Sequence, residues 1–238
     1  MILADLGPLA QLRAGRLGRR LPQLYVGLWL YGVSLAMMVR ADLGAAPWDV
    51  LHLGIARYVP LSLGEVLIVV SLLVLLLWIP LREVPGLGTI SNALVIGIAT
   101  DATLSVLERP DELWLRITLM VVGVLGNGAA TAFYIGAQLG RGPRDGLMTG
   151  LHRRTGISLR VVRTGLEVTV VAIGLLLGGV AGIGTVLYAL SIGPVTQALL
   201  PALTVRLAPP AAPPLEEPLD EPLDEPGVDP ASATASSR

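Results

Sequence analysis

The chain has 238 residues, of which 53% are hydrophobic and only 15% are charged, and its mean hydropathy is +0.70. This composition excludes a water-soluble globular domain for the bulk of the chain. The formal net charge of −1 is misleading, because the acidic residues gather near the C-terminus and the remainder is basic. Cysteine is absent, which excludes disulfides, thiol catalysis and cysteine metal sites.

The first expected element is an Arg-rich N-terminal segment, residues 1–21, which should lie in the cytoplasm. Six apolar stretches follow, each long enough or nearly so to cross the ~30 Å hydrocarbon core of a bilayer as a helix. They cover about residues 22–40, 63–81, 87–107, 114–136, 159–178 and 184–204. The sequence therefore predicts an all-α membrane protein with about six transmembrane helices.

Two shorter segments, 46–57 and 142–153, lie between these stretches. Each has about 12 residues, roughly 18 Å of helix, and each contains histidine and arginine. We expect short helices that do not span the bilayer and that are either re-entrant or interfacial. If both segments crossed instead, each half of the chain would have four spans.

The last segment, residues 208–238, is rich in proline and acidic residues and contains no aromatic residue. Such a composition cannot bury enough apolar surface to fold, so we expect a disordered cytoplasmic tail. Its short Leu-Asp-Glu-Pro repeat either keeps the tail solvated or recruits a protein partner.

The membrane part of the chain repeats itself. Residues 27–100 align with residues 123–196 at a constant offset of 96 without a gap, and about a third of the aligned positions are identical. This period is too long for a solenoid unit and is typical of transporters built from duplicated halves. We therefore expect a first repeat over residues 22–110 and a second over residues 111–207.

Arginines are distributed unevenly between the two sides of the membrane. With six spans and the N-terminus inside, the outer segments hold only Arg40, Arg57, Arg109 and Arg116. The cytoplasmic segments hold the larger group: Arg13, Arg16, Arg19, Arg20, Arg82, Arg141, Arg144, Arg153, Arg154, Arg160 and Arg206. This is the positive-inside pattern, and it predicts that both termini are cytoplasmic. Because three is an odd number of spans, the second half must enter the membrane in the opposite orientation, which makes the 3+3 repeat inverted.

A Pro-x-Asp element begins each short segment, with Pro47 and Asp49 in the first copy and Pro143 and Asp145 in the second. Proline suits the first helical position, and an aspartate two residues later faces the free amides and positive dipole of the helix start. The two aspartates are then helix-start residues. Alternatively, two half-helices point their N-termini at the midplane and the aspartates bind cations or protons.

The two copies differ beside these aspartates, where Trp48 aligns with Arg144. An aromatic edge on one side and a guanidinium on the other would suit an amphiphilic or anionic substrate. Arg144 has a second interpretation, in which it lies on the cytoplasmic side and only holds the orientation of the protein.

Arg163 and Glu167 lie four residues apart in the fifth apolar stretch, so they can neutralise each other on one helix face. Their counterparts in the first repeat, Leu67 and Ser71, are uncharged. The pair is either structural or coupled to a ligand, since polar residues inside a membrane are candidates for function.

The quoted motifs resemble a known group of bacterial proteins. Residues 40–50, 85–92 and 140–148 are similar to the YczE/YyaS/YitT group of bacterial integral membrane proteins, over about residues 20 to 205. The resemblance implies a multi-pass plasma-membrane protein, and it supplies no established substrate or catalytic residue.

The function that these features favour is a small secondary transporter or exporter of an unidentified small molecule or ion in the bacterial plasma (inner) membrane. Its substrate path would be formed by Asp49, Asp145, Trp48, Arg144, Arg163 and Glu167. A non-transporting scaffold or regulator of a partner enzyme, working through the tail, is the alternative. No nucleophile–His–Asp arrangement or metal-ligand cluster is visible, so we expect no enzyme activity, cofactor, metal or nucleic-acid partner.

Overall fold

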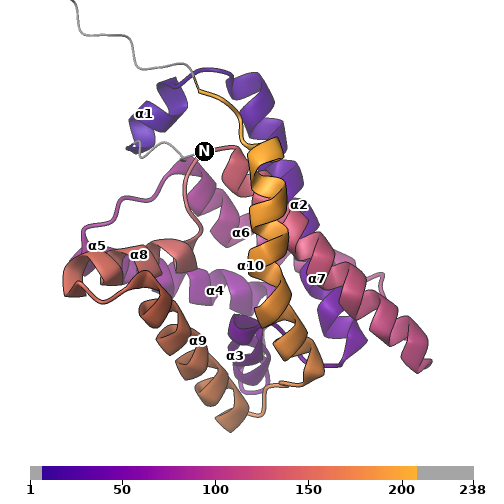
Figure 1. Cartoon of the computed structure of the whole chain (residues 1–238). Helices are drawn as coiled ribbons and strands as arrows, with labels where there is room; N and C mark the ends of the chain where they lie inside the picture. Colours follow the sequence, from indigo (N-terminus) through magenta and orange to yellow (C-terminus); the bar gives the residue numbers. More distant parts are fainter. Residues whose placement is uncertain (1–6, 208–238) are drawn as a thin grey trace, which may run out of the picture. The chain divides into compact units, whose positions relative to one another are not determined.

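The computed structural model describes residues 7–207. In this range all regular secondary structure is α-helical, as the composition predicts, and the tail from residue 208 and the first six residues lie outside it. The helices are α1 (Pro8–Arg13), α2 (Leu17–Ala41), α3 (Pro47–Ala56), α4 (Leu63–Leu76), α5 (Trp78–Leu81), α6 (Leu87–Leu104), α7 (Leu113–Gly136), α8 (Pro143–Thr155), α9 (Leu159–Leu176) and α10 (Ile183–Leu203) (Figure 1).

The two longest helices, α2 and α7, pack against each other and run antiparallel. Gly27 near the start of α2 lies against Tyr134 near the end of α7, and Gly123 in α7 lies against Met38 near the end of α2. A Cβ on Gly27 would be 2.7 Å from the backbone nitrogen of Tyr134. Glycine is therefore needed here for the close approach on which helix packing in lipid depends.

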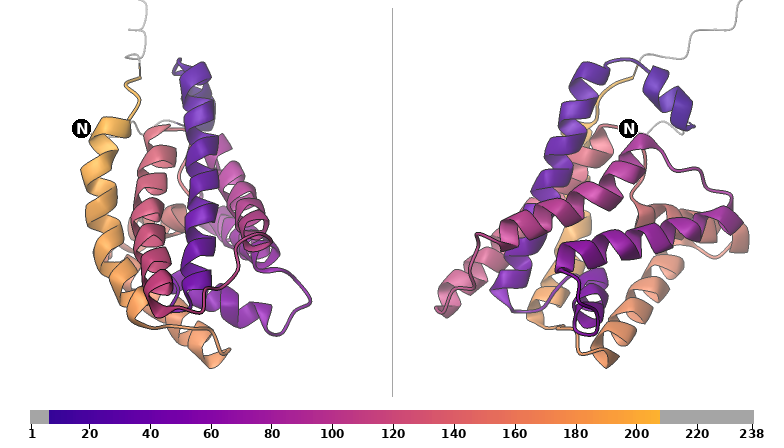
Figure 2. Two further views of the ribbon diagram at one scale, coloured as in Figure 1. Left: turned by 90° about the vertical axis from the view of Figure 1, so that its right-hand side faces the viewer. Right: turned by 180° about the vertical axis from the view of Figure 1, so that it is seen from behind.

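Each of these two helices has a parallel neighbour, α6 beside α2 and α10 beside α7. The Thr100 hydroxyl of α6 donates to the Gly32 carbonyl of α2 at 3.4 Å, and the Thr196 hydroxyl of α10 donates to the Gly128 carbonyl of α7 at 3.3 Å. Figure 2 shows α10, α7 and α2 side by side in its left view.

Corresponding helices of the two halves begin 96 residues apart. The first residues of α2, α3, α4 and α6 are Leu17, Pro47, Leu63 and Leu87, and those of α7, α8, α9 and α10 are Leu113, Pro143, Leu159 and Ile183. The offset found in the sequence is thus also the offset between helix starts.

Contacts between the halves occur as matching pairs as well. The Gly88 amide donates to the Leu139 carbonyl at 2.7 Å, and the Gly184 amide donates to the Leu43 carbonyl at 2.8 Å. Gly88 aligns with Gly184 and Leu43 aligns with Leu139, so each half donates one of these two equivalent hydrogen bonds and accepts the other.

Five helices are long and apolar enough to span a membrane: α2, α4 together with α5, α6, α7 and α10. They correspond to five of the six predicted spans, although α2 begins at Leu17, earlier than expected. The sixth stretch forms α9, which is 18 residues long and carries Arg160, Arg163 and Glu167. Because burial of each charged side chain in hydrocarbon costs free energy, α9 is not among the helices that are clearly apolar enough to span a membrane.

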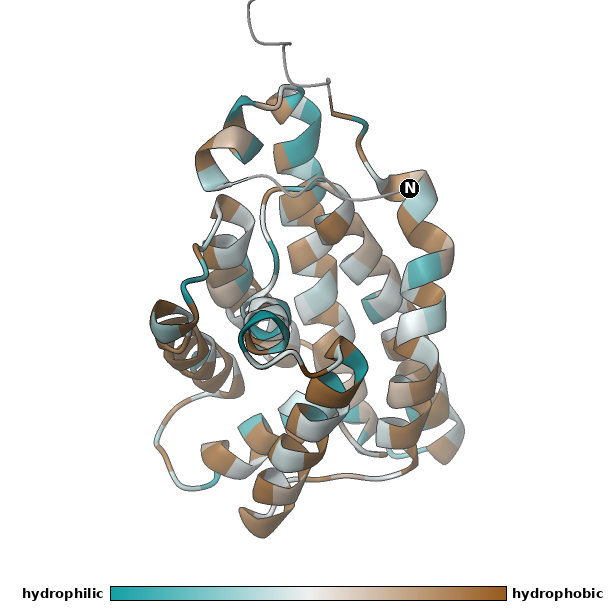
Figure 3. Ribbon diagram, turned by 60° about the vertical axis from the view of Figure 1, so that its left-hand side comes forward, coloured by the Kyte–Doolittle hydropathy of each residue, from teal (hydrophilic) through white to brown (hydrophobic). Residues whose placement is uncertain are grey.

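The long helices consist largely of hydrophobic residues (Figure 3), and many of their large apolar side chains are exposed. Trp29 is 46% exposed, Leu73 is 56% exposed and Leu190 is 71% exposed. Exposed apolar surface on this scale is unfavourable in water and suits contact with lipid acyl chains.

The two short segments are helices, as predicted. α3 has 10 residues and α8 has 13, which corresponds to about 15 and about 20 Å, less than the ~30 Å of a bilayer core. The predicted span 63–81 is broken at Leu77 into α4 and α5.

Arginines join the ends of the two antiparallel helices. Arg20 of α2 is fully buried and donates to the carbonyls of Ala137 at 2.8 Å and Gln138 at 2.6 Å, after the end of α7. Arg116, at the aligned position of α7, donates to the carbonyls of Ala41 at 2.8 Å and Asp42 at 2.5 Å, at the end of α2. Each cation thus meets the negative end of the partner helix. Arg20, which belongs to the predicted Arg-rich N-terminal segment, is thus part of α2 and buried in its packing.

One helix pair differs between the halves. In the first half α4 packs against α6, and Asp101 of α6 accepts hydrogen bonds from the Ser62 hydroxyl at 2.5 Å and the Gly64 amide at 2.8 Å. The corresponding helices α9 and α10 are not packed against each other in this way, and Gln197 stands where Asp101 would be. The two halves therefore differ in how their last two long helices pack.

Candidate functional site

The starts of α3 and α8 are formed by the two Pro-x-Asp elements. Pro47 and Pro143 occupy the first turn of each helix, as predicted. The chain reaches each start through a glycine with positive φ, Gly44 at +114° and Gly140 at +134°. A Cβ on Gly44 would be 2.5 Å from the backbone nitrogen of Gly182, so both the conformation and the space require glycine.

The two starts meet through Arg144. This α8 side chain places its guanidinium carbon 5.1 Å from the ring centroid of Trp48 in α3. Its Nη2 is 3.8 Å from Oδ1 of Asp49, which is an ion-pair distance and too long for a hydrogen bond. Three of the predicted site residues, one from the second half and two from the first, are thus brought together.

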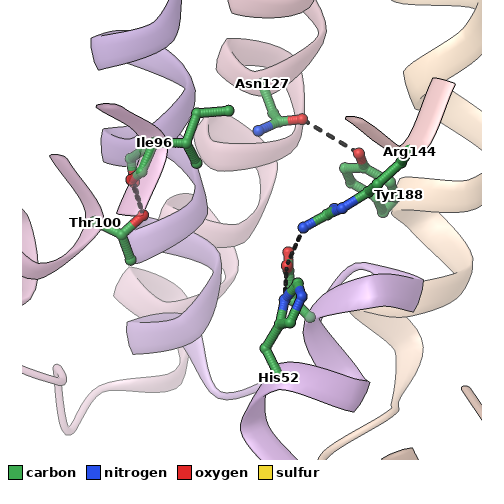
Figure 4. A network of polar contacts seen from close by, with 8 residues as sticks. His52, Ile96, Thr100, Asn127, Arg144 and Tyr188 are labelled. Atoms are coloured by element: carbon green, nitrogen blue, oxygen red, sulfur yellow. Dashed lines mark hydrogen bonds and ion pairs between the residues drawn. The ribbon is translucent and has the colours of Figure 1, made fainter. Parts of the chain in front are cut away.

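Asp49 is held from the other side by His52, one turn further along α3 (Figure 4). The Nδ1 of His52 lies 3.0 Å from Oδ1 of Asp49, and both side chains are buried. An ionised Asp49 only accepts, so Nδ1 carries the proton in this pair. Nε2 of His52 is then an acceptor, and it has no hydrogen-bond partner in the described part of the chain. Burial lowers the pKa of the His52 imidazole below its ordinary value, although the bond to Asp49 opposes this.

Asp145 has a different environment from Asp49. Its Oδ2 accepts a hydrogen bond from the Tyr134 hydroxyl at 3.0 Å. Burial raises the pKa of the Asp145 carboxyl above its ordinary value, and the Tyr134 bond and the charge of Arg163 oppose this rise. The aspartates at matching positions are therefore chemically unequal, one paired with an imidazole and one with a phenol.

A cavity of about 230 Å³ lies in front of α8. It is larger than the ~150 Å³ apolar cavity that accepts benzene. Apolar side chains from α4, α6 and α10 form part of the wall. The polar part of the wall includes Tyr31, Asn92, Tyr134, Arg144, Asp145, Arg163, Tyr188 and Gln197.

Arg163 and Glu167 form the predicted pair on α9. Nε of Arg163 donates to Oε1 of Glu167 at 2.9 Å. Arg163 lines the cavity, and Glu167 is not part of its wall. Of the six predicted site residues, Arg144, Asp145 and Arg163 line the cavity. Trp48 and Asp49 contact Arg144, and Glu167 pairs with Arg163.

The predicted site did not include the aromatic and amide residues around the cavity. Tyr31 and Tyr134 are in edge contact, with centroids 6.3 Å apart, and the Tyr188 hydroxyl donates to Oδ1 of Asn127 at 3.3 Å. The Nδ2 of Asn127 is buried without a partner in the described residues. Tyr31 aligns with Asn127 and Asn92 with Tyr188, and this exchange of residue types between the halves was the available signal.

No group of three or more His, Asp or Glu side chains able to hold a metal ion occurs between residues 7 and 207. The chemistry that the described residues offer is recognition of charge and transfer of protons, from two guanidiniums, three carboxyls and one imidazole.

Comparison with known proteins covers the same region as the helices. The model of a family of unknown function (DUF6198) matches residues 18–201. The chain belongs to this family. The matched range extends from the first turn of α2 into the last turn of α10, so it contains the whole cavity and both Pro-x-Asp elements.

Three relatives extend this family assignment. A Haemophilus influenzae protein, described as an uncharacterized protein, is 42% identical over 177 residues, which are 74% of this chain and 81% of that protein. The uncharacterized membrane protein YczE of Bacillus subtilis is 31% identical over 72% of this chain and 80% of its own length. The uncharacterized protein YyaS of the same species is 22% identical over 74% of this chain and 90% of its own length. The resemblance to YczE and YyaS is confirmed, and with the apolar helices it identifies a membrane protein. No solved structure matches the chain.

Proposed function

We propose that this family member is a small secondary transporter whose substrate site is the cavity in front of α8. The observation that carries the proposal is the meeting of the two short helix starts, where Arg144 from the second half lies over Trp48 and beside Asp49 from the first. Discontinuous helices whose N-termini converge between two repeats are the usual construction of transporter sites.

The proposal includes an inverted repeat of two halves, with α9 as the sixth span. The antiparallel course of α2 and α7, which are the first long helices of the two halves, supports this arrangement. The matching helix starts and the matching pairs of hydrogen bonds support it too. The arginine distribution supports a bacterial plasma membrane location with both termini in the cytoplasm.

In this proposal the substrate crosses the membrane without covalent change. One half rocks against the other about the fixed cavity, which alternating access requires. The unequal packing of α4 on α6 and of α9 on α10 is what one end-state of such a motion looks like, since a pseudo-symmetric protein open on one side must break its own symmetry.

The test is transport by the purified full-length protein in proteoliposomes, with uptake and efflux measured for a panel of small organic acids, amines and neutral metabolites. We expect at least one compound to be moved, and we expect Arg144→Gln to reduce its flux at least tenfold. Arg19→Gln, which removes an exposed arginine outside the site, is the matched control and should leave flux unchanged. A deletion of residues 208–238 should also leave it unchanged, whereas a regulator that works through the tail would lose its effect. Absence of flux for the whole panel, with and without a proton gradient, would contradict the proposal.

A further inference from the structure

The groups around Asp49 form a three-part electrostatic unit. Asp49 lies between an imidazole at hydrogen-bond distance, 3.0 Å, and a guanidinium at 3.8 Å. The Asp49 carboxylate therefore interacts with a neutral imidazole on one side and with a cation on the other. Arg144 makes no hydrogen bond to any other described residue and lines the cavity, so its donors are available to a ligand.

His52 is the unexplained member of this unit. Its side chain is fully buried, yet Nε2 has no partner in the described residues. An unpaired polar atom in a buried site costs free energy, so it needs a reason. A proton on Nε2 would convert His52 into an imidazolium already bonded to a carboxylate, which is the favourable arrangement for a buried cation.

We propose that His52 and Asp49 form a proton-binding pair and that its protonation releases Arg144 to bind the carboxylate of a small monovalent organic acid. The inference deepens the proposed function and rests on it for the role of the cavity as a substrate site. It assigns both the coupling ion and the chemical class of the substrate.

Charge balance links the two binding events. Without ligand, Asp49 is negative, Arg144 is positive and His52 is neutral, so the unit has no net charge. When Nε2 accepts a proton from water, Asp49 is neutralised by the imidazolium and Arg144 loses its counter-ion. A substrate carboxylate then replaces that counter-ion, and the loaded unit is again neutral. Either event alone would leave an uncompensated charge in a poorly solvated site, which is costly.

The cavity wall indicates the remainder of the substrate. Two guanidiniums line it, but that of Arg163 is already paired with Glu167, which leaves one cation for one carboxylate. A planar guanidinium matches a carboxylate through two parallel hydrogen bonds. The tyrosines Tyr31, Tyr134 and Tyr188 and the apolar wall favour an apolar or aromatic body, and a volume of about 230 Å³ suits a ligand somewhat larger than benzene.

The other titratable groups near the unit already have partners of their own. Helices α3, α4, α8 and α9 pack around it. On α4 the acidic residue is Glu65, which caps its own helix start at Ser62, and on α9 Arg163 and Glu167 pair with each other. Asp145 on α8 is bonded to Tyr134, and burial favours its neutral form. Of these groups, His52 is the one with an open nitrogen and a carboxylate on its other nitrogen.

The experiment uses the full chain in nanodiscs of neutral lipid, with potassium benzoate as the probe and benzamide as its uncharged control. Isothermal titration calorimetry in two buffers of different ionisation enthalpy counts the protons taken up. We expect about one proton per benzoate, as linkage of the two sites requires, and an affinity that falls about tenfold per pH unit in the neutral range. Benzamide should bind without proton uptake.

The decisive variant is His52→Asn, which can still donate to Asp49 through its amide but cannot titrate. It should lose the proton uptake and the pH dependence, while His152→Gln, the matched change at the other histidine, should keep both. Unchanged proton uptake in His52→Asn, or no benzoate binding by the wild-type protein at pH 5, would overturn the inference.

A second measurement does not depend on the folding of that variant. In wild-type protein labelled with ¹⁵N-histidine, benzoate added at constant pH should shift the His52 nitrogens to imidazolium values, with assignment from His152→Gln. No shift at saturating benzoate would also overturn the inference. Both measurements report binding and not flux. Benzoate binding with proton uptake, but without transport in liposomes, would contradict the proposed function alone. Transport that does not depend on His52 would contradict the inference alone.

Discussion

Replacement of the buried arginine at the start of α2 should destabilise the protein far more than replacement of its repeat counterpart. Arg20 is fully buried and donates to four backbone carbonyls, those of Ala137, Gln138, Gln11 and Gly15. Hydrogen bonds from charged groups contribute about 1.5–3 kcal/mol each, and they are not additive within one site. Leaving a buried acceptor without a partner costs about 1–3 kcal/mol, and because the four bonds share one side chain we expect a total loss of about 3–5 kcal/mol for Arg20→Gln.

Arg116 makes corresponding contacts at the other end of the helix pair, but its side chain is 16% exposed. Water can reach the groups that Arg116→Gln would leave, so the loss should be only about 1–2 kcal/mol. For a chain of this size, 1 kcal/mol corresponds to about 2–4 °C in Tm. We expect a decrease of roughly 6–20 °C for Arg20→Gln and of roughly 2–8 °C for Arg116→Gln.

The assay is thermal unfolding in detergent, followed by circular dichroism at 222 nm and by the monodisperse fraction after heating. Arg20→Lys, which keeps the charge but not the planar set of donors, should fall between the wild type and Arg20→Gln. An equal Tm loss for Arg20→Gln and Arg116→Gln would refute the reasoning, because burial would then not govern the strength of these contacts.

Three further predictions concern single positions. Gly32→Ala should lower the free energy of unfolding by about 1–3 kcal/mol, because the new Cβ would be 2.6 Å from Cβ of Ala99. Gly165→Ala is the control and should cost nothing, because no atom lies within 4 Å of its Cβ. Equal losses of stability for the two variants in a thermal melt in detergent would contradict this prediction. Asp145 has a raised pKa, so the folded state binds its proton more tightly than the unfolded state and loses stability as pH rises from the ordinary pKa to the folded one. Asp145→Asn should therefore match the wild type in Tm at pH 4 and exceed it at pH 8, and a lower Tm at pH 8 would mean that the ionised carboxylate is stabilising. Asp101→Ala removes the acceptor of the hydrogen bonds from Ser62 and Gly64 and should lower stability by about 1–2 kcal/mol. The loss should appear as faster amide hydrogen exchange at the start of α4. Unchanged exchange there would show that these hydrogen bonds are dispensable.

Much of the helix arrangement could be predicted from the sequence because it depends on local signals. Proline at the first helical position and glycine three residues before it mark the starts of α3 and α8 within one residue of their observed positions. The constant offset predicts the start of every second-half helix from its first-half counterpart. The status of α9 was harder, because three charges in one helix oppose the apolar pattern of the rest.

The site could be predicted only in part, since it depends on how distant segments meet. The residue types at Asp49, Trp48 and Arg144 suggested chemistry, but their contact requires the antiparallel packing of α2 and α7 and the glycine turns before each short helix. His52 has no histidine partner and no histidine at the aligned position of the second half, so the sequence alone did not mark it as a site residue. The spacing of three residues from Asp49 on one helix face was the overlooked signal.

The matching pairs of contacts between the halves have a consequence for the covalent link between them. Gly88 with Leu139 and Gly184 with Leu43 are two copies of one interface, the arrangement seen in two-fold symmetric homodimers. Two separate half-length chains that packed in this way would form the same surface. Residues 105–112, which connect α6 to α7, take no part in these pairs. The two fragments made by cutting there therefore keep every group needed to recognise each other, and co-expressed halves should reassemble into one complex.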